Sequence, residues 1–300
     1  MTTWDSTAVK SVQFIPGLDK VALGLEDQVI LYAPQDPQTI ERLPLPASDI
    51  PWMNPGLLFS PDGSLVARLR GECPSDSQRC HIEVGSRSGE PTLLGLETDV
   101  FSAIAISPDD RYLFLGNSNG LTVYSLSNGK QVTILPESVY FDHLAISPDG
   151  SLAGGFVGTG DYVNIYRLPS GDLAYRLQPP AYAGAFYPNN AVFSPDGKTL
   201  AVGANGLIGI WQAEDGTELR FWQPHNVEIG DMGFSPDGKL LVSGDSDGNL
   251  VISDVAQGKA VNNFKAHRGL IWRAFFAAQG RLLCTFGQDG LLRVWGIPPI

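Results

Sequence analysis

The amino-acid sequence predicts an all-β protein built from seven copies of a four-stranded antiparallel unit. A turn sequence, Ser-Pro-Asp-Gly or Ser-Pro-Asp-Asp, recurs five times. It stands at Ser60–Gly63, Ser107–Asp110, Ser147–Gly150, Ser194–Gly197 and Ser235–Gly238. With two degenerate copies, the apolar residues that precede the turns fall at positions 14, 59, 106, 146, 193, 234 and 276, which are 40 to 47 residues apart. A fixed period of this length indicates a repeat architecture.

Each copy contains the same sequence of short strands and turns. An apolar run such as Ile104–Ile106 leads to the turn, where Pro sets φ and Gly accepts a positive φ. A second apolar run, such as Leu240–Ser243, leads to a two-residue turn such as Asp247-Gly248, which is a strong hairpin signal. A third run, such as Leu292–Trp295, and a weaker fourth run complete the copy. Short strands at this spacing predict four-stranded antiparallel sheets.

One such sheet has two faces to bury. A β-sandwich or an open solenoid would satisfy part of the pattern, but sheets stacked around a ring give every sheet a dry face on either side. We therefore predict a seven-bladed β-propeller that occupies residues 1–300 as a single domain.

Composition and charge exclude several classes. The net charge of −12 argues against a general nucleic-acid binder, because such proteins need clusters of Lys and Arg. The sequence contains no run of about 18 apolar residues, so we predict no membrane span. The polar start does not resemble a signal peptide. We expect an acidic, cytoplasmic protein. Cys73 and Cys80 flank a long hairpin and could pair, but we expect reduced thiols there, whereas Cys284 belongs to the core.

The seventh copy carries a pattern of polar residues and a Trp that resembles the WD-repeat β-propeller family. In that family a His, a Ser or Thr, an Asp and a Trp form a hydrogen-bonded tetrad. The resemblance implies a tetrad of His267, Thr285, Asp289 and Trp295. In the sixth copy it implies His225, Ser243 and Asp247, with Ser253 in place of the Trp.

The sequence contains no catalytic constellation that we recognise. His225 and His267 are explained as tetrad members, and His81 and His143 as packing residues. The turn aspartates are dispersed among the copies, where Asp side chains bond local backbone. Nucleophile-elbow, phosphate-loop and zinc-ligand motifs are missing from the sequence. We therefore expect no catalytic residue, no metal and no cofactor.

Aromatic residues gather in the loops that lead into the first strands. Such residues are typical anchors for protein partners, although part of the group could simply pack the ends of the blades. The predicted partner-binding residues are Trp52, Met53, Phe101, Tyr140, Phe141, Tyr182, Tyr187 and Glu228, and Trp222 is a further aromatic of this kind. Acidic residues flank the same loops, so the expected partner is a protein or peptide of basic or mixed charge.

The seventh blade lacks an obvious fourth strand. Only Gly296–Ile300 follow Trp295, and little sequence precedes the first copy. The blade could have three strands, the termini could rearrange, or another chain could donate a strand. We expect a partner to cover or pair with this open edge.

These observations predict a non-catalytic scaffold for protein–protein interaction, or an assembly subunit of a larger complex. Two alternatives remain. One is an enzyme, such as a hydrolase or lyase, that uses the central channel. The other is a sensor module of a signalling protein.

Overall fold

The structure is a computed structural model of the 300-residue chain. It describes residues 2–4, 9, 11–25, 28–44, 57–70, 79–87, 94–99, 103–117, 120–135, 140–156, 162–180 and 187–297. Two compact units are distinguished, one of residues 8–137 and the other of residues 138–300 with 1–7. The described residues form seven four-stranded antiparallel sheets, which confirms the predicted seven-bladed β-propeller.

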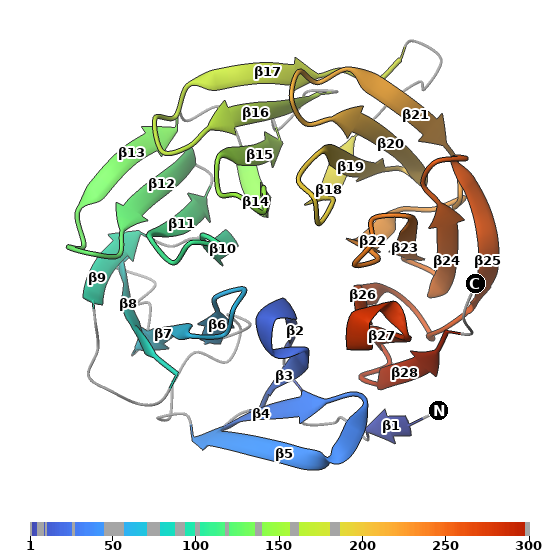
Figure 1. Cartoon of the computed structure of the whole chain (residues 1–300), viewed down its shortest axis with the longest axis horizontal. Coiled ribbons are helices and arrows are strands. Elements are labelled where there is room, and N and C mark those ends of the chain that lie inside the picture. The colour runs from blue at the N-terminus through green and yellow to red at the C-terminus, as the bar shows by residue number, and fades with distance from the viewer. Residues whose placement is uncertain are drawn as a thin grey trace. The chain divides into compact units, whose positions relative to one another are not determined.

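The unit of residues 8–137 holds three sheets (Figure 1), in each of which the strands lie in sequence order. The first is β2 (Ser11–Ile15), β3 (Lys20–Gly24), β4 (Gln28–Ala33) and β5 (Asp36–Pro44), with the short 3₁₀ turn η1 (Pro16–Leu18). The second is β6 (Leu57–Phe59), β7 (Leu65–Arg70), β8 (Arg79–Ser86) and β9 (Leu94–Asp99). The third is β10 (Ala103–Ile106), β11 (Tyr112–Asn117), β12 (Gly120–Ser125) and β13 (Gln131–Leu135).

The other unit holds four sheets. Its first is β14 (Tyr140–Ile146), β15 (Leu152–Phe156), β16 (Val163–Arg167) and β17 (Leu173–Leu177). The second is β18 (Pro188–Phe193), β19 (Thr199–Ala204), β20 (Leu207–Gln212) and β21 (Glu218–Trp222). The third is β22 (Ile229–Phe234), β23 (Leu240–Asp245), β24 (Asn249–Asp254) and β25 (Lys259–Lys265). The fourth is β26 (Ile271–Ala277), β27 (Leu282–Gly287), β28 (Leu292–Gly296) and β1 (Thr2–Trp4), with the 3₁₀ turn η3 (Ala278–Gly280).

The repeat register is the same in all seven sheets. Each predicted anchor residue pairs with the residue seven positions later on the second strand. These pairs are Phe14 with Val21, Phe59 with Val66, Ile106 with Leu113, Ile146 with Ala153, Phe193 with Leu200, Phe234 with Leu241 and Phe276 with Leu283. The two degenerate copies therefore keep the hairpin geometry even though they have lost the Ser-Pro-Asp sequence.

The serine of each intact turn closes the hairpin. Ser60 donates its hydroxyl to Asp62 Oδ1 at 2.6 Å and accepts the backbone N–H of Leu65 at 3.0 Å. The other four turns repeat both bonds. The five serines are at most 4% exposed, so each turn satisfies a buried hydroxyl locally.

Neighbouring sheets pack face to face within each unit. Val163 and Ile165 of β16 pack in one cluster with Phe193 and Trp211 of the next sheet. Similar clusters join the sheet of β18–β21 to that of β22–β25, and that sheet to β26–β27. In the other unit, clusters join the first sheet to the second and the second to the third. Apolar burial between sheets is the main stabilising contribution to such a fold.

The open edge expected at the seventh blade is occupied by the chain itself. β1 pairs with β28, with Thr2 opposite Val294 and Trp4 opposite Leu292, and Figure 1 shows the two strands side by side. The expectation that another chain donates this strand is therefore wrong over these residues. Of the three alternatives that the sequence left open, the one in which the chain's own terminus supplies the strand is the one found, and the strand β1 has three residues.

Candidate functional site

The four predicted tetrad residues of the seventh blade lie within hydrogen-bonding distance of one another. His267 Nδ1 lies 2.8 Å from Asp289 Oδ1, and His267 Nε2 lies 2.8 Å from Thr285 Oγ1. Trp295 Nε1 donates to the same Thr285 oxygen at 3.1 Å. The bonds connect the segment before the first strand with the second strand, the following hairpin and the third strand. The tetrad therefore cross-links one blade.

Burial and hydrogen bonding set the protonation states in this tetrad. Burial lowers the pKa of His267, although Asp289 opposes the shift. Burial alone would raise the pKa of Asp289, but hydrogen bonds from His267, the Arg268 N–H and Arg293 outweigh it and lower the pKa to about 2. At neutral pH the tetrad therefore contains a neutral imidazole and an ionised carboxylate.

The sixth blade uses a different aspartate from the one predicted. His225 Nδ1 lies 3.0 Å from Asp245 Oδ2, and His225 Nε2 lies 2.8 Å from Ser243 Oγ. Asp247, which we had assigned to the tetrad, instead donates its backbone N–H to Asp245 Oδ1 at 3.0 Å. The assignment of Asp247 is therefore wrong, and Asp245 takes its place.

The two blades take their carboxylates from different positions because they differ in the last residue of the second strand. Asp245 is 2% exposed and also accepts the backbone and side-chain N–H groups of Asn249, so its carboxylate is fully satisfied there. The equivalent residue of the seventh blade is Gly287, where a Cβ atom would lie 2.5 Å from the His267 ring. The seventh blade therefore takes its carboxylate from the hairpin, whereas the sixth takes it from the strand.

Both tetrads use both nitrogens of their imidazole rings. A general base needs a ring nitrogen within reach of a substrate. The tetrad histidines are also at most 3% exposed. Their arrangement stabilises blades and offers no proton-transfer group at the surface.

The predicted partner-binding residues divide into those the structure describes and those it does not. Tyr187, directly before β18, is 58% exposed, and Glu228, directly before β22, is also exposed. Tyr140 and Phe141 begin β14, but their side chains lie outside the described set. Trp52, Met53, Phe101 and Tyr182 also lie outside the described residues, as does Cys73.

Polar side chains connect the beginnings of β18, β22 and β26. Asn189 donates to Glu228 Oε1 at 2.8 Å and to the Ile229 carbonyl at 2.9 Å. Asp231 accepts the backbone N–H of Ala274 at 2.8 Å, and Arg273 Nη1 lies 4.0 Å from the same carboxylate. Hydrogen bonds from side chains thus connect the first strands of three neighbouring sheets at one end.

A glycine allows two of these strands to approach closely. A Cβ atom on Gly230 would lie 2.3 Å from the Ile271 carbonyl oxygen. β22 and β26 can therefore lie closer together at this point than two strands with side chains could. The exposed residues at the beginnings of both strands therefore stand on adjacent strands.

Trp272 is an exposed aromatic residue on this surface that sequence analysis missed. It is 41% exposed, and its ring lies 5.4 Å from that of Phe286 underneath. The Arg273 side chain beside it is 50% exposed. The predicted partner-binding residues include none from the segment that leads into β26. A Trp four before the anchor, where the equivalent residues of the two preceding sheets are Asn189 and Gly230, was the available signal.

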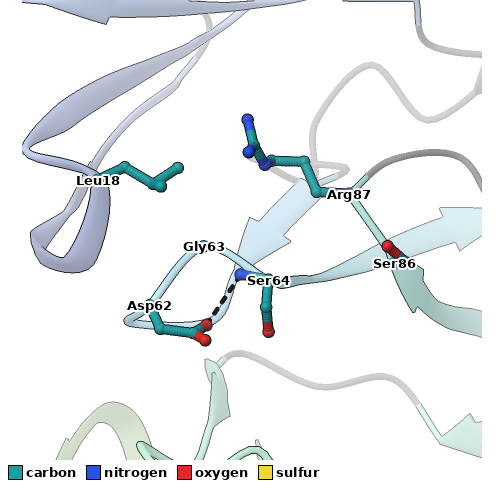
Figure 2. Close-up of a pocket in the computed structure, with 6 residues that line it drawn as sticks. All are labelled: Leu18, Asp62, Gly63, Ser64, Ser86 and Arg87. Carbon is teal, nitrogen blue, oxygen red and sulfur yellow. Dashed lines mark hydrogen bonds between the residues drawn. The ribbon is translucent and has the colours of Figure 1, made fainter.

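A separate cavity of about 320 Å³ lies in the unit of residues 8–137, between Leu18, the turn at Asp62–Ser64, and Arg87 (Figure 2). Its charged groups already have partners in the chain. Asp62 Oδ1 accepts the Ser64 N–H at 2.8 Å, and Arg87 Nη1 donates to both oxygens of Glu41 at 3.0 Å. The cavity offers no unpartnered charge for catalysis among the residues described.

Within the described ranges, His, Cys, Asp and Glu residues form no group of three or more that could bind a metal ion. The same ranges contain no helix with the length and hydropathy of a membrane span.

Comparison with known proteins finds WD40-type and other propeller relatives. A family model described as the anaphase-promoting complex subunit 4 WD40 domain matches residues 220–279, which include His225 and His267. The β subunit of the guanine nucleotide-binding protein of Nicotiana tabacum is 24% identical over 96% of this chain and 80% of its own length. The chain is thus similar to WD40-type β-propeller proteins.

Two other similar proteins differ from this chain in length or in sequence. Telomerase protein component 1 of Rattus norvegicus is 26% identical over 90% of this chain, but the match spans only 10% of that protein. A chain in the crystal structure of the mitotic checkpoint complex superposes with a TM-score of 0.75 at 18% identity, over 99% of this chain and 95% of that one. That likeness shows the shared propeller fold.

Proposed function

We propose that this WD-repeat propeller is a non-catalytic scaffold that holds a protein partner. The observation that carries the proposal is the surface at the beginnings of β18, β22 and β26. There the exposed rings of Tyr187 and Trp272 stand on strands that are connected by Asn189, Glu228 and Asp231. We call these residues, together with Arg273, the strand-end surface.

The chemistry of the strand-end surface suits a protein partner better than a substrate. Large aromatic side chains supply contact area at low entropic cost and dominate many protein interfaces. Glu228 and Arg273 place one charge of each sign beside them, which suits a segment of mixed charge. The non-catalytic role is supported by tetrad histidines whose ring nitrogens are all engaged.

The relatives support an assembly role by analogy. One is a subunit of a guanine nucleotide-binding protein, and another stands in a mitotic checkpoint complex. We include a place in the cytoplasm in the proposal. We also propose that the seven blades act as one domain.

The test is quantitative affinity capture with the full chain as bait. Trp272→Ala and Tyr187→Ala should each lower recovery of a specific partner by about tenfold or more. Leu219→Ala and Val261→Ala are matched controls, because these residues are 45% and 55% exposed on the outer strands β21 and β25. They should leave recovery unchanged. Equal recovery with all four variants, or equal loss in the controls, would contradict the proposal.

A further inference from the structure

Arg176 on β17 carries a guanidinium group that neutral side chains hold in one orientation. Its Nε donates to Asn164 Oδ1 at 3.1 Å, and its Cζ lies 5.1 Å from the centre of the Tyr162 ring. Asn164 and Arg176 are opposite each other in the pairing of β16 and β17. The hydrogen bond fixes how far the side chain reaches, and the ring restricts the plane of the guanidinium.

Asn164 is itself fixed by a second bond. It is 5% exposed, and its Nδ2 donates to the Tyr166 hydroxyl oxygen at 2.9 Å. A buried amide costs free energy unless its polar atoms are hydrogen-bonded. Flipping the amide would place its NH₂ group against the Arg176 Nε–H, which is also a donor, and would lose that bond. Asn164 thus uses its Nδ2 on Tyr166 and its Oδ1 on Arg176, so the orientation of its amide is coupled to that of the guanidinium.

Three other arginines of the described chain are held by carboxylates, whereas Arg42 donates to Gln28 Oε1 and Arg281 to the Ala278 carbonyl oxygen. Arg87 bonds Glu41, Arg111 bonds Asp109, and Arg293 bonds Asp289. Within the described residues, no carboxylate oxygen lies within 4.0 Å of the Arg176 guanidinium, and the residue is exposed. Among the described residues the positive charge of Arg176 is therefore oriented but not paired, in a chain whose net charge is −12.

We infer that Arg176 is a docking site for a single carboxylate, the side chain of an Asp or Glu on a protein partner. With Nε on Asn164, the two Nη groups remain, and they match the two oxygens of a carboxylate. A phosphate carries up to two charges and is usually bound by several donors, and an acidic chain with one arginine here does not supply them. The inference rests on the proposed scaffold function, but it concerns a different sheet from the strand-end surface.

The test uses the full chain labelled with ¹⁵N and N-acetyl-glutamate amide as the probe, at constant ionic strength. The Nε–Hε resonance of Arg176 should shift to saturation with the probe and stay in place with N-acetyl-glutamine amide. Asn164→Ala keeps the charge and removes its orientation, so binding should weaken about fivefold or more. Arg176→Lys, followed through the backbone amides of β16 and β17, should weaken it similarly. Arg220→Lys on β21 is the control and should change nothing.

Four results would overturn the inference. They are an equal response to the glutamine probe, full binding by Asn164→Ala, saturation by inorganic phosphate without a response to the carboxylate, and tighter probe binding in Asp161→Asn. The last would show that this chain's own carboxylate next to Tyr162 occupies the site. Partner loss in Trp272→Ala is measured separately, so failure here does not imply failure of the scaffold proposal.

Discussion

Trp222 of β21 donates its indole N–H to the hydroxyl of Ser253 on β24, 3.3 Å away in the next sheet. Ser253 is fully buried and stands where the WD-repeat pattern has a Trp. In the seventh blade, Trp295 donates its indole N–H to the Thr285 hydroxyl of the same blade. In the sixth blade, the indole N–H comes from Trp222 of the neighbouring blade and goes to Ser253. Trp222, which we had grouped with the exposed aromatics of the loops, is therefore part of a contact between sheets.

This contact predicts a measurable coupling. Trp222→Phe should lower the free energy of unfolding by about 1–2 kcal/mol, because it leaves the buried Ser253 hydroxyl without its donor. Ser253→Ala should cost less, since it removes that hydroxyl. In a double-mutant cycle measured by urea denaturation, the two changes should couple by about 1 kcal/mol. Strict additivity would mean that the bond contributes nothing.

The hydroxyl of Thr285 should contribute more to the stability of the fold than its methyl group does. Thr285→Val keeps the shape but leaves His267 Nε2 and Trp295 Nε1 without their shared partner, which should cost about 2–4 kcal/mol. Thr285→Ser keeps the hydroxyl and should cost about 1 kcal/mol. Thermal unfolding of the two variants compares these costs directly. A less stable Ser variant would show that packing, not hydrogen bonding, dominates at this position.

Stability should fall in two steps as the pH is lowered. Burial lowers the pKa values of His225 and His267 below the ordinary 6.5, so the folded state binds fewer protons than the unfolded state just below that pH. Their contribution is complete above 6.5 and is lost as the pH falls through the folded-state pKa values. The second step begins below 3.8, where Asp289, with its pKa of about 2, loses its contribution.

The two steps can be separated by measuring melting temperature against pH. A His225→Gln, His267→Gln double variant should be less stable at pH 7. Its melting temperature should change less between pH 6.5 and 5 than that of the unmodified protein. An unchanged slope in that range would show that the tetrad histidines do not control it.

Sequence alone predicted the blades because each strand of the repeat is specified locally. Pro-Asp-Gly turns and alternating apolar runs mark every hairpin, and all seven anchors pair as the period requires. Contacts between copies were harder to predict from the sequence. The Trp222–Ser253 bond joins residues 31 positions apart, and no turn or period signals it. The choice of Asp245 over Asp247 depended on whether a side chain fits beside the His ring, which spacing does not reveal.

Replacing Asp110 by Asn should raise the melting temperature, whereas the same replacement at the neighbouring Asp109 should lower it. Burial raises the pKa of Asp110, and the nearby Asp62 and Asp109 raise it further, despite a 2.7 Å bond from the Ser64 hydroxyl. Asp110→Asn keeps an acceptor and tolerates the positive φ of 57°. It should raise the melting temperature by about 1–2 °C at pH 7, after allowance for solvent screening.

The sign of the pH dependence provides a check. A raised folded-state pKa means that ionised Asp110 costs stability as the pH rises above 3.8, so the gain in Asp110→Asn should shrink toward pH 4. Burial opposes ionisation at Asp109 too, but hydrogen bonds from Ser107 and Arg111 prevail and lower its pKa. Asp109→Asn should therefore lower the melting temperature at pH 7. Equal signs for the two variants would contradict this account.

Two turn glycines with similar backbone angles should differ in their tolerance of a methyl group. Gly238 has a φ of 71° and Gly248 a φ of 87°, so alanine is strained at both, by about 1–2 kcal/mol. At Gly238 a Cβ atom would meet nothing within 4 Å, whereas at Gly248 it would lie 2.3 Å from the His267 carbonyl oxygen. That oxygen belongs to the backbone of a tetrad residue and cannot move without disturbing the tetrad. Gly238→Ala should therefore show only the backbone strain in urea denaturation, and Gly248→Ala should lose at least about 2 kcal/mol more. Equal losses would mean that the hairpin can shift away from His267 at little cost.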